Sequence, residues 1–296
     1  GIILSTLIGL LIGIARLSNN YLISKLAGGY IELFRNIPIL LQILFWYNLF
    51  INVFPHPKQS LAFFDIAFLN QRGLYLPKPI PEDGFLFVAL AFIIGIIAAY
   101  FVKKFFKRKH ELTGSHTSTW PYTLGLVVGF PVIVYLLIGS PLQFDYAVLG
   151  KFNLKGGMAV VPEFLALTFA LSVYTATYIA EAIRSGIEAV DKGQKEAAAA
   201  IGLSPIQSLK LIVLPQALRV AIPPTINQYL NLTKNSSLAT VIGYPELMST
   251  FGGTVLNQVG QAVEILAMAM LVYLVISLFI SLLLNYVNKK MEIQGR

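Results

Sequence analysis

Several polar residues fall inside one long apolar stretch of the chain, and they are the residues best placed to do chemistry. They are Asn227, Gln228, Asn231, Lys234, Asn235, Ser236 and Ser237, and Glu264 follows in the next apolar stretch. A polar side chain in a membrane is costly unless it is paired or lines a cavity, so these residues are candidates for a pathway. They could equally cap a broken helix, since Pro223 and Pro224 remove helix donors, or hydrogen-bond between helices.

Residues that could support catalysis or bind a metal ion are sparse. His56, His110 and His116 lie in predicted loops and show no metal-ligand spacing. Asp145 and Glu163 have no evident nucleophile or base partner in the sequence. We therefore expect no catalytic residue and no metal site, and a protein that is not itself an enzyme.

The composition indicates an integral membrane protein. Of the 296 residues, 56% are hydrophobic and 12% are charged, whereas soluble domains carry roughly 25% charged residues. The mean hydropathy is +0.71. So few polar residues could not cover the core of a water-soluble globule of this length. Because the chain has no cysteine, a disulfide scaffold is excluded as well.

Seven apolar stretches predict an all-α, polytopic protein with about seven transmembrane helices. They are approximately Gly1–Ala15, Ile37–Phe54, Phe85–Val102, Tyr122–Gly139, Val160–Ala182, Val213–Asn235 and Gln261–Val287. Fifteen residues rise only about 22 Å as a helix, whereas the hydrocarbon core is about 30 Å thick. We therefore expect the sequence to begin inside a helix whose first residues are missing.

Two local patterns concern packing and connections. Gly9-xxx-Gly13 and Gly125-xxx-Gly129 could let helices approach closely. The proline-rich stretch Pro55–Gly84 is expected to form an extended external loop with at most a short helix.

Charge placement orients the predicted spans. With seven alternating spans, fourteen basic residues fall on one side: Arg16, Lys25, Arg35, Lys103, Lys104, Lys107, Arg108, Lys109, Arg184, Lys192, Lys195, Lys289, Lys290 and Arg296. The other side receives five: Lys58, Arg72, Lys78, Lys151 and Lys155. The excess assigns the first side, with the C-terminus, to the cytoplasm. This topology accounts for the net charge of +8, so we expect no nucleic-acid partner.

The stretch 196–215, between the fifth and sixth predicted spans, carries strong local signals. Glu196 begins an alanine-rich run of high helix propensity, and Gly202 suits the left-handed residue that closes a helix. Ser204, Pro205 and Gln207 fit the N-cap, first turn and capping box of a following helix. We expect a helix, a sharp turn and a second helix, all between the two spans. Composition alone would favour an ordinary loop of this kind.

The spacing of residues over the whole stretch 196–215 is more specific than its composition. Glu-Ala-Ala, three residues, Gly, nine residues and then Ile-x-Leu-Pro resembles the signature of permease subunits in binding-protein-dependent ABC importers. The matching positions are Glu196, Ala197, Ala198, Gly202, Ile212, Leu214 and Pro215. Tyr30–Pro38, Thr233–Leu238 and Val241–Gly243 resemble the polar amino-acid branch of that family. The resemblance covers the first two apolar stretches and everything from about residue 160 onward.

The resemblance implies one transmembrane permease domain over residues 1–296, with the core of a type I importer. Core helices would occupy about 1–54 and 160–290, and a cytoplasmic coupling loop about 184–212. An additional helix pair at about 84–140 resembles the insertion in larger subunits of general L-amino-acid importers. The implied location is the bacterial cytoplasmic (inner) membrane.

The same resemblance implies partners and roles. Two ATP-binding subunits would hold ATP and Mg, because this chain has no phosphate-binding loop and is expected to bind no cofactor itself. A second permease, expected to be a different chain, and an external or periplasmic solute-binding protein would complete the importer. The residues that would couple to the ATPase are Glu196, Ala197, Ala198, Gly202 and Leu203.

An L-amino acid would be the substrate, and its path would run past Asn227, Asn231, Lys234, Asn235, Ser236 and Glu264. Lys234 could donate to the carboxylate of a zwitterion, and Glu264 could accept from its ammonium group. The alternative is an ion-coupled secondary amino-acid transporter or channel that uses the same two residues. Such a carrier has no use for an ATPase-docking helix, so the Glu-Ala-Ala loop separates the two hypotheses. A structural subunit without a path fits the insertion but not a polar helix break at Pro223 and Pro224.

Overall fold

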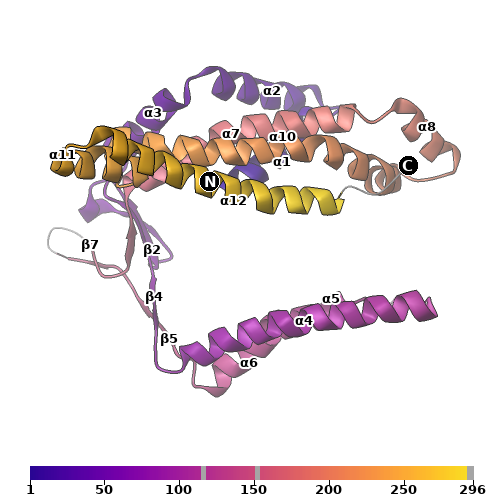
Figure 1. Ribbon diagram of the computed structural model, residues 1–296, viewed down its shortest axis with the longest axis horizontal. Helices are drawn as coiled ribbons and strands as arrows, with labels where there is room; N and C mark the ends of the chain where they lie inside the picture. The colour runs from indigo at the N-terminus through magenta and orange to yellow at the C-terminus, as the bar shows by residue number, and fades with distance from the viewer. Residues whose placement is uncertain (115–117, 151–153, 292–296) are drawn as a thin grey trace. The chain divides into compact units, whose positions relative to one another are not determined.

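The computed structural model describes residues 1–114, 118–150 and 154–291 (Figure 1). His116, Lys151 and Arg296, which the charge and ligand arguments named, lie outside the described residues. The chain divides into two compact units. Unit 1 consists of Gly1–His56, Asn70–Gly73 and Val160–Arg296, and unit 2 of Pro57–Leu69 and Leu74–Ala159.

Each of the seven predicted apolar stretches contains a helix. Five segments are long and apolar enough to cross a membrane by themselves: Phe85–Leu112, Trp120–Leu137, Pro162–Glu188, Pro205–Ile242 and Ala262–Tyr286. A sixth span is formed only if α2 (Tyr21–Asn36) and α3 (Ile39–Val53) are counted together, because they meet at a bend of 103°. Helix α1 (Ile2–Arg16) is apolar but has 15 residues. The predicted helical membrane fold is confirmed.

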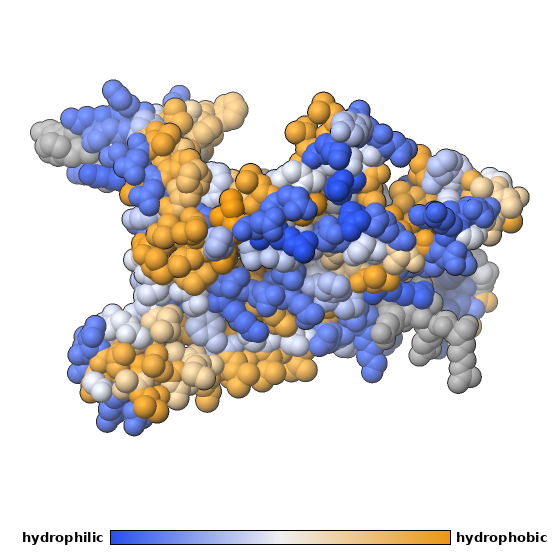
Figure 2. Space-filling view, turned by 90° about the horizontal axis from the view of Figure 1, so that it is seen from above, coloured by the Kyte–Doolittle hydropathy of each residue, from blue (hydrophilic) through white to orange (hydrophobic). Residues whose placement is uncertain are grey.

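The bend between α2 and α3 is built from local chemistry. Ile37 is extended (φ −91°, ψ 128°), as expected for a residue before proline. The side-chain amide of Gln42 donates to the carbonyl oxygens of Phe34 (2.7 Å) and Ile37 (2.9 Å), which the break leaves without helical donors. Figure 2, seen from above relative to Figure 1, shows hydrophilic and hydrophobic side chains mixed over one face.

Helix α7 (Pro162–Glu188) forms the centre of unit 1, where α1, α3 and α10 (Leu214–Asn235) pack against it (Figure 1). Small residues allow this, since Ala166, Ala170, Ala176 and Ala180 are fully buried. A Cβ atom on Gly9 would lie 2.7 Å from Cβ of Ile179, and one on Gly13 would lie 3.0 Å from the carbonyl oxygen of Ala180. The close approach predicted for the first glycine pair is confirmed. Helix α12 (Ala262–Met291) packs against α10.

Unit 2 contains α4 (Phe85–Thr113) and a second helical segment made of α5 (Trp120–Leu124), the π-helical turn η2 (Gly125–Gly129) and α6 (Phe130–Leu137). The prediction for the second glycine pair is wrong, because no atom lies within 4 Å of a Cβ placed on Gly125 or Gly129. The close approach occurs instead at Gly95 of α4, where a Cβ would lie 2.2 Å from the carbonyl oxygen of Leu126.

The stretch Pro55–Gly84 contains no helix longer than a 3₁₀ turn, as expected, but it is organised into short strands, and further short strands lie within 142–160. They are β1 (Leu61–Phe63), β2 (Ala67–Asn70), β3 (Gly73–Leu76), β4 (Lys78–Pro81), β5 (Leu142–Asp145), β6 (Val148–Leu149), β7 (Leu154–Lys155) and β8 (Met158–Val160), and the 3₁₀ turn η1 (Pro57–Gln59) precedes them. The sheet orders are β1-β2-β3-β8, β4-β5 and β6-β7. In the second sheet Lys78 pairs with Asp145 and Pro81 with Leu142. These strands are an addition to the all-α class expected from the apolar stretches.

Candidate functional site

The Glu-Ala-Ala stretch forms α8 (Lys192–Ala200), which follows α7 after a short turn. Asp191 caps its first turn, because its carboxylate accepts from the backbone N–H of Gly193 at 2.7 Å. At the other end Gly202 adopts the left-handed conformation, with φ +80°. Its N–H donates to the carbonyl oxygen of Ala199 (3.0 Å), and that of Leu203 donates to Ala198 (3.1 Å). The predicted helix-closing glycine is confirmed.

Ser204 starts the next helix, α9 (Pro205–Ser208), and the predicted capping box is present. The N–H of Ser204 donates to Oε1 of Gln207 at 2.9 Å, and the N–H of Gln207 donates to Oγ of Ser204 at 3.4 Å. Pro205 occupies the first turn, where its missing N–H costs nothing.

The second helix does not stay between the spans, which corrects the sequence-based expectation. Helix α9 continues through the π-helical turn η3 (Leu209–Val213) into α10 and the 3₁₀ turn η4 (Ser236–Ile242), so that Pro205–Ile242 is one candidate span. A proline normally interrupts a helix because it cannot make the i→i−4 hydrogen bond. Here the wider π-helical turn just before Pro215 bypasses that bond, and the chain continues.

The residues of α8 differ sharply in exposure. Ala198 is buried inside this chain, at 1% exposure, whereas Glu196 and Ala197 are exposed. A Cβ atom on Gly202 would meet no atom within 4 Å. Ile201 and Ile206 flank the turn and are 75% and 66% exposed. The outer side of α8 and its turn therefore present small and apolar residues together with the charged side chains of Lys192, Lys195 and Glu196, while Ala198 packs on the inner side.

The elements that carry α8 are packed tightly. A Cβ atom on Gly186 of α7 would lie 2.6 Å from the carbonyl oxygen of Ala217 on α10. Val190, Val213 and Ala217 form a buried cluster between the same elements. Both ends of the α8 segment therefore leave a close-packed helix pair.

A charged cluster at the same end of α7 escaped the sequence analysis. Arg184 pairs with Glu181 and Glu188 at 2.5 Å each, and the charges of Arg16 and Arg35 also act on Glu181. The guanidinium group of Arg35 lies over the ring of Tyr178, 5.8 Å from its centre. The i,i+3 and i,i+4 spacing around Arg184 was the available signal. The cluster ties α1 and α2 to α7 beside the segment that leads to α8.

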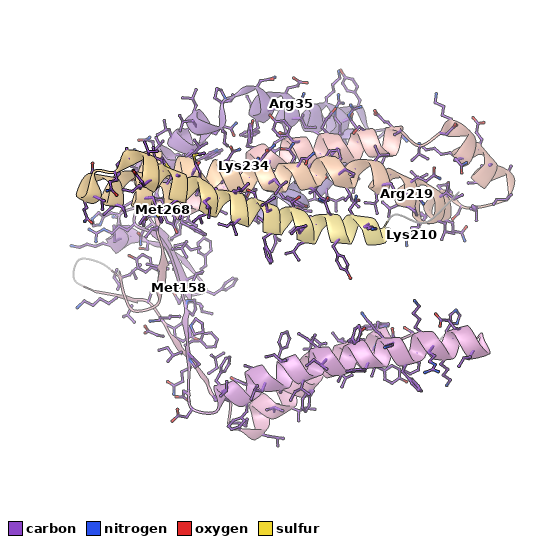
Figure 3. The ribbon with its side chains drawn as sticks, in the orientation of Figure 1. Arg35, Met158, Lys210, Arg219, Lys234 and Met268 are labelled. Carbon is purple, nitrogen blue, oxygen red and sulfur yellow. The ribbon has the colours of Figure 1, made fainter. Side chains whose placement is uncertain are left out.

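Asn227, Asn231 and Lys234 share one face of α10, because they are spaced by four and three residues. All three are exposed in this chain. Lys234 lies at the C-terminal end of α10, whereas Arg219 in the first turns of α10 and Lys210 in η3 lie toward α8 (Figure 3). Within residues 1–114, 118–150 and 154–291, neither Lys234 nor Glu264 takes part in an ion pair. The structure therefore groups three of the predicted path residues and does not join Lys234 to Glu264.

The remaining predicted path residues lie near the ends of helices. Asn235 is the last residue of α10, and Glu264 is exposed in the first turn of α12. The hydroxyls of Ser236 and Ser237 donate to the carbonyl oxygens of Thr233 (2.7 Å) and Lys234 (2.8 Å), where the α-helix becomes 3₁₀. These two side chains thus satisfy local backbone groups.

The helix break at Pro223 and Pro224, which was one alternative explanation of the polar residues, does not occur. Helix α10 runs through both residues, and Thr225 donates from its hydroxyl to the carbonyl oxygen of Ala221 at 2.8 Å. Consecutive prolines remove donors, but packing of α10 against α7 maintains the helix around them.

Glu246 is a second residue that the sequence analysis missed. It lies between η4 and the π-helical turn η5 (Ser249–Val255), and its carboxylate accepts from the N–H groups of Met248 (2.8 Å) and Ser249 (2.7 Å). The hydroxyl of Tyr273 on α12 donates to it at 2.8 Å. The spacing of Glu246 and Ser249 resembles a capping box with the two roles exchanged, since Oγ of Ser249 accepts from the N–H of Glu246 at 3.2 Å.

Comparison with known proteins gives a family and a fold. Residues 91–293 match the family model described as "Binding-protein-dependent transport system inner membrane component". The permease protein YhdX of Escherichia coli (strain K12) is 50% identical over 295 residues, covering 100% of this chain and 75% of that protein. The "General L-amino acid transport system permease protein AapQ" of Rhizobium johnstonii is 49% identical, covering 100% and 74%.

A solved structure is also similar. The crystal structure of an amino acid ABC transporter with histidines superposes with a TM-score of 0.55 at 20% identity, covering 98% of this chain and 86% of that chain. At this identity the likeness concerns the fold alone.

Proposed function

This chain belongs to the family of binding-protein-dependent transport system inner membrane components, and we propose that it is a transmembrane subunit of an ATP-driven importer that moves L-amino acids into the cytoplasm. The observation that carries the proposal is the form of α8: an exposed helix and glycine turn, rigidly held by α7 and α10. Relatives named as amino-acid permeases support the substrate class.

Glu196, Ala197, Gly202 and Leu203 form the surface that docks on an ATP-binding subunit. Ala197 and Gly202 add little bulk of their own and permit close approach of the partner's backbone, and Glu196 supplies a charge for a basic group on the partner. Ala198 acts from the inner side, because its burial fixes α8 against this chain. Closure of the ATPases would then move α7 and α10 as one body, which is the requirement for switching between inward-open and outward-open states.

The complete importer contains two ATP-binding subunits, which hold ATP and Mg, together with a second permease that is a different chain and an external solute-binding protein. The proposed orientation puts α8 and the C-terminus at the cytoplasmic side of the bacterial inner membrane, and the excess of basic residues on that side supports it.

The polar face of α10 contributes to the substrate path. Asn227, Asn231 and Lys234 are exposed on a helix that crosses the membrane, where contact with lipid would be costly. We therefore assign this face to the junction with the second permease. Lys234 would donate to the substrate carboxylate, and Asn235, Ser236 and Glu264 would lie toward one end of the path, where the carboxylate of Glu264 would accept from the ammonium group.

The experiment that tests the proposal is uptake of radiolabelled L-amino acids by proteoliposomes that hold the complete complex and its binding protein, with ATP sealed inside. Gly202→Asp is expected to lower uptake at least tenfold, since it places a charged side chain at a left-handed position on the docking surface. The matched control is Gly114→Asp at the end of α4, which also has positive φ (+66°) and open surroundings, and it should retain uptake.

Two outcomes would contradict the proposal. Uptake that continues without ATP and follows an ion gradient would favour an ion-coupled carrier. Equal loss in the Gly202 and Gly114 variants would show that backbone strain, rather than the docking surface, explains the effect.

A further inference from the structure

Helix α4 extends beyond the thickness of a membrane. It has 29 residues, and a helix of that length measures about 43 Å against a hydrocarbon core of about 30 Å. The residues from Phe85 to Val102 carry no charge, and Lys103 is the first charged residue of the helix. The last two to three turns of α4 are therefore placed at the depth of the lipid headgroups.

One side of α4 is taken up by packing within unit 2. Ala91 and Ala99 are buried, and Gly95 between them meets the backbone of Leu126. Farther along the same side, the ring of Phe106 stacks on that of Tyr122, with centres 5.4 Å apart. This side faces α5, η2 and α6.

Four basic residues lie on a different side of the helix. Lys103 and Lys107 are one turn apart, as are Lys104 and Arg108, so the four form two adjacent rows, which we term the basic face. At about 100° per residue, the centre of the basic face lies about 145° from the packing side, and Lys109 lies on the packing side. All four basic-face residues are exposed.

The charge of the basic face is only partly balanced. Glu111 is the acidic residue within the same rows, and its Oε1 lies 3.9 Å from Nζ of Lys107, with the two side chains 61% and 80% exposed. Four positive charges and one negative charge leave a net charge of +3 on the face. An ion pair this exposed is weak and opens readily, so Lys107 can still bind another anion.

Aromatic residues border the basic face on its membrane side. Tyr100 and Phe101, one turn before Lys103 and Lys104, are 63% and 60% exposed. Exposed tyrosine rings near a helix end are typical of the membrane–water interface.

We propose that the basic face of α4, made of Lys103, Lys104, Lys107 and Arg108, binds the headgroups of anionic phospholipids. Clusters of four or more basic residues directly beyond a membrane span attract anionic lipid. The headgroup depth of the end of α4, the positive charge of the basic face and the aromatic rings beside it all favour a lipid phosphate as the ligand. Basic residues that only set the orientation of the helix could lie on any side of it. These four instead share one face, and that face is separate from the side that packs within unit 2.

The test uses the purified complex of this chain with its partner subunits in mild detergent, and native mass spectrometry measures retention of phosphatidylglycerol and phosphatidylcholine with the same acyl chains. Phosphatidylglycerol is expected to bind at least tenfold more tightly. Lys104→Gln should weaken that binding about fivefold, whereas Lys109→Gln, a matched loss of charge on the packing side, should change it less than twofold. Lys104→Arg should retain it.

Each variant keeps at least four of the five basic residues of 103–109, so insertion of α4 is preserved. Equal retention of the two lipids would overturn the proposal, as would an equal effect of the Lys104 and Lys109 substitutions. Displacement of the lipid by inorganic phosphate at the same concentration would identify a free-anion site instead, and it would overturn the assignment to lipid.

Discussion

The hydroxyl of Tyr273, inside α12, donates to the carboxylate of Glu246 at 2.8 Å, so it fastens the segment between α10 and α12 to the side of α12. Glu246 also accepts from Thr240 and from the backbone N–H of Met248 and Ser249. One carboxylate thus contacts three separate pieces of chain: η4, the start of η5 and α12.

Tyr273→Phe should weaken this junction. The substitution keeps the ring but removes one donor from a charged acceptor, which costs about 1.5–3 kcal/mol. We expect a lower Tm of the purified complex and slower uptake. Tyr21→Phe on α2, where the side chain is 76% exposed, is the control and should leave Tm unchanged. An unchanged Tm in Tyr273→Phe would show that the hydrogen bond does not stabilise the junction.

Gln42→Leu should destabilise the bend between α2 and α3. The amide of Gln42 is the donor for the carbonyl oxygens of Phe34 and Ile37, and each lost hydrogen bond costs about 1 kcal/mol. Thermal unfolding should show a lower Tm for Gln42→Leu. The control Asn48→Leu removes an exposed amide that is hydrogen-bonded within α3, and it should lower Tm less. Equal effects would exclude a special role for the bend.

Gly9→Val should prevent normal packing of α1 on α7. Its Cβ would lie 2.7 Å from Cβ of Ile179, closer than carbon atoms pack, so we expect a severe loss of monodisperse protein in detergent. Gly125→Val is the matched control, since its Cβ meets open space, and it should express like the unaltered chain. Normal yield of Gly9→Val would refute the tight α1–α7 contact.

Asn231→Leu tests the polar face of α10. The side chain is exposed in this chain, so Tm should remain within a few degrees, whereas uptake should fall at least tenfold because a polar contact to substrate is lost. Asn285→Leu on α12, also exposed, should keep both Tm and uptake. If Asn231→Leu lowers Tm by many degrees as well as lowering uptake, Asn231 has a packing role instead.

Local signals were the most predictable part of this protein. The left-handed Gly202 and the capping box of Ser204 and Gln207 involve contiguous residues, so the sequence contains everything that determines them. The apolar stretches likewise identified the spanning helices, because the membrane requires a fixed length of apolar chain.

Features that depend on distant residues were not predictable. The uninterrupted course of α10 through Pro223 and Pro224 depends on packing against α7, and the exposed surroundings of Gly125 follow from which side of the helix faces α4. The bond from Tyr273 to Glu246 joins residues 27 positions apart. For the candidate site, the sequence identified the residues of α8 but not that Ala198 faces inward.

The π-helical turn at Leu209–Val213 has a consequence for the phase of the helix beyond it. Such a turn holds one residue more than an α-helical turn, and one residue corresponds to about 100° of rotation. Every side chain after Pro215 is therefore rotated about the helix axis relative to where an unbroken α-helix from Ser204 would put it. The direction in which Asn231 and Lys234 point about the helix axis, relative to the Gly202 turn, depends on the one extra residue of the π-helical turn. An insertion or deletion in that turn would therefore rotate the polar face without changing any of its side chains.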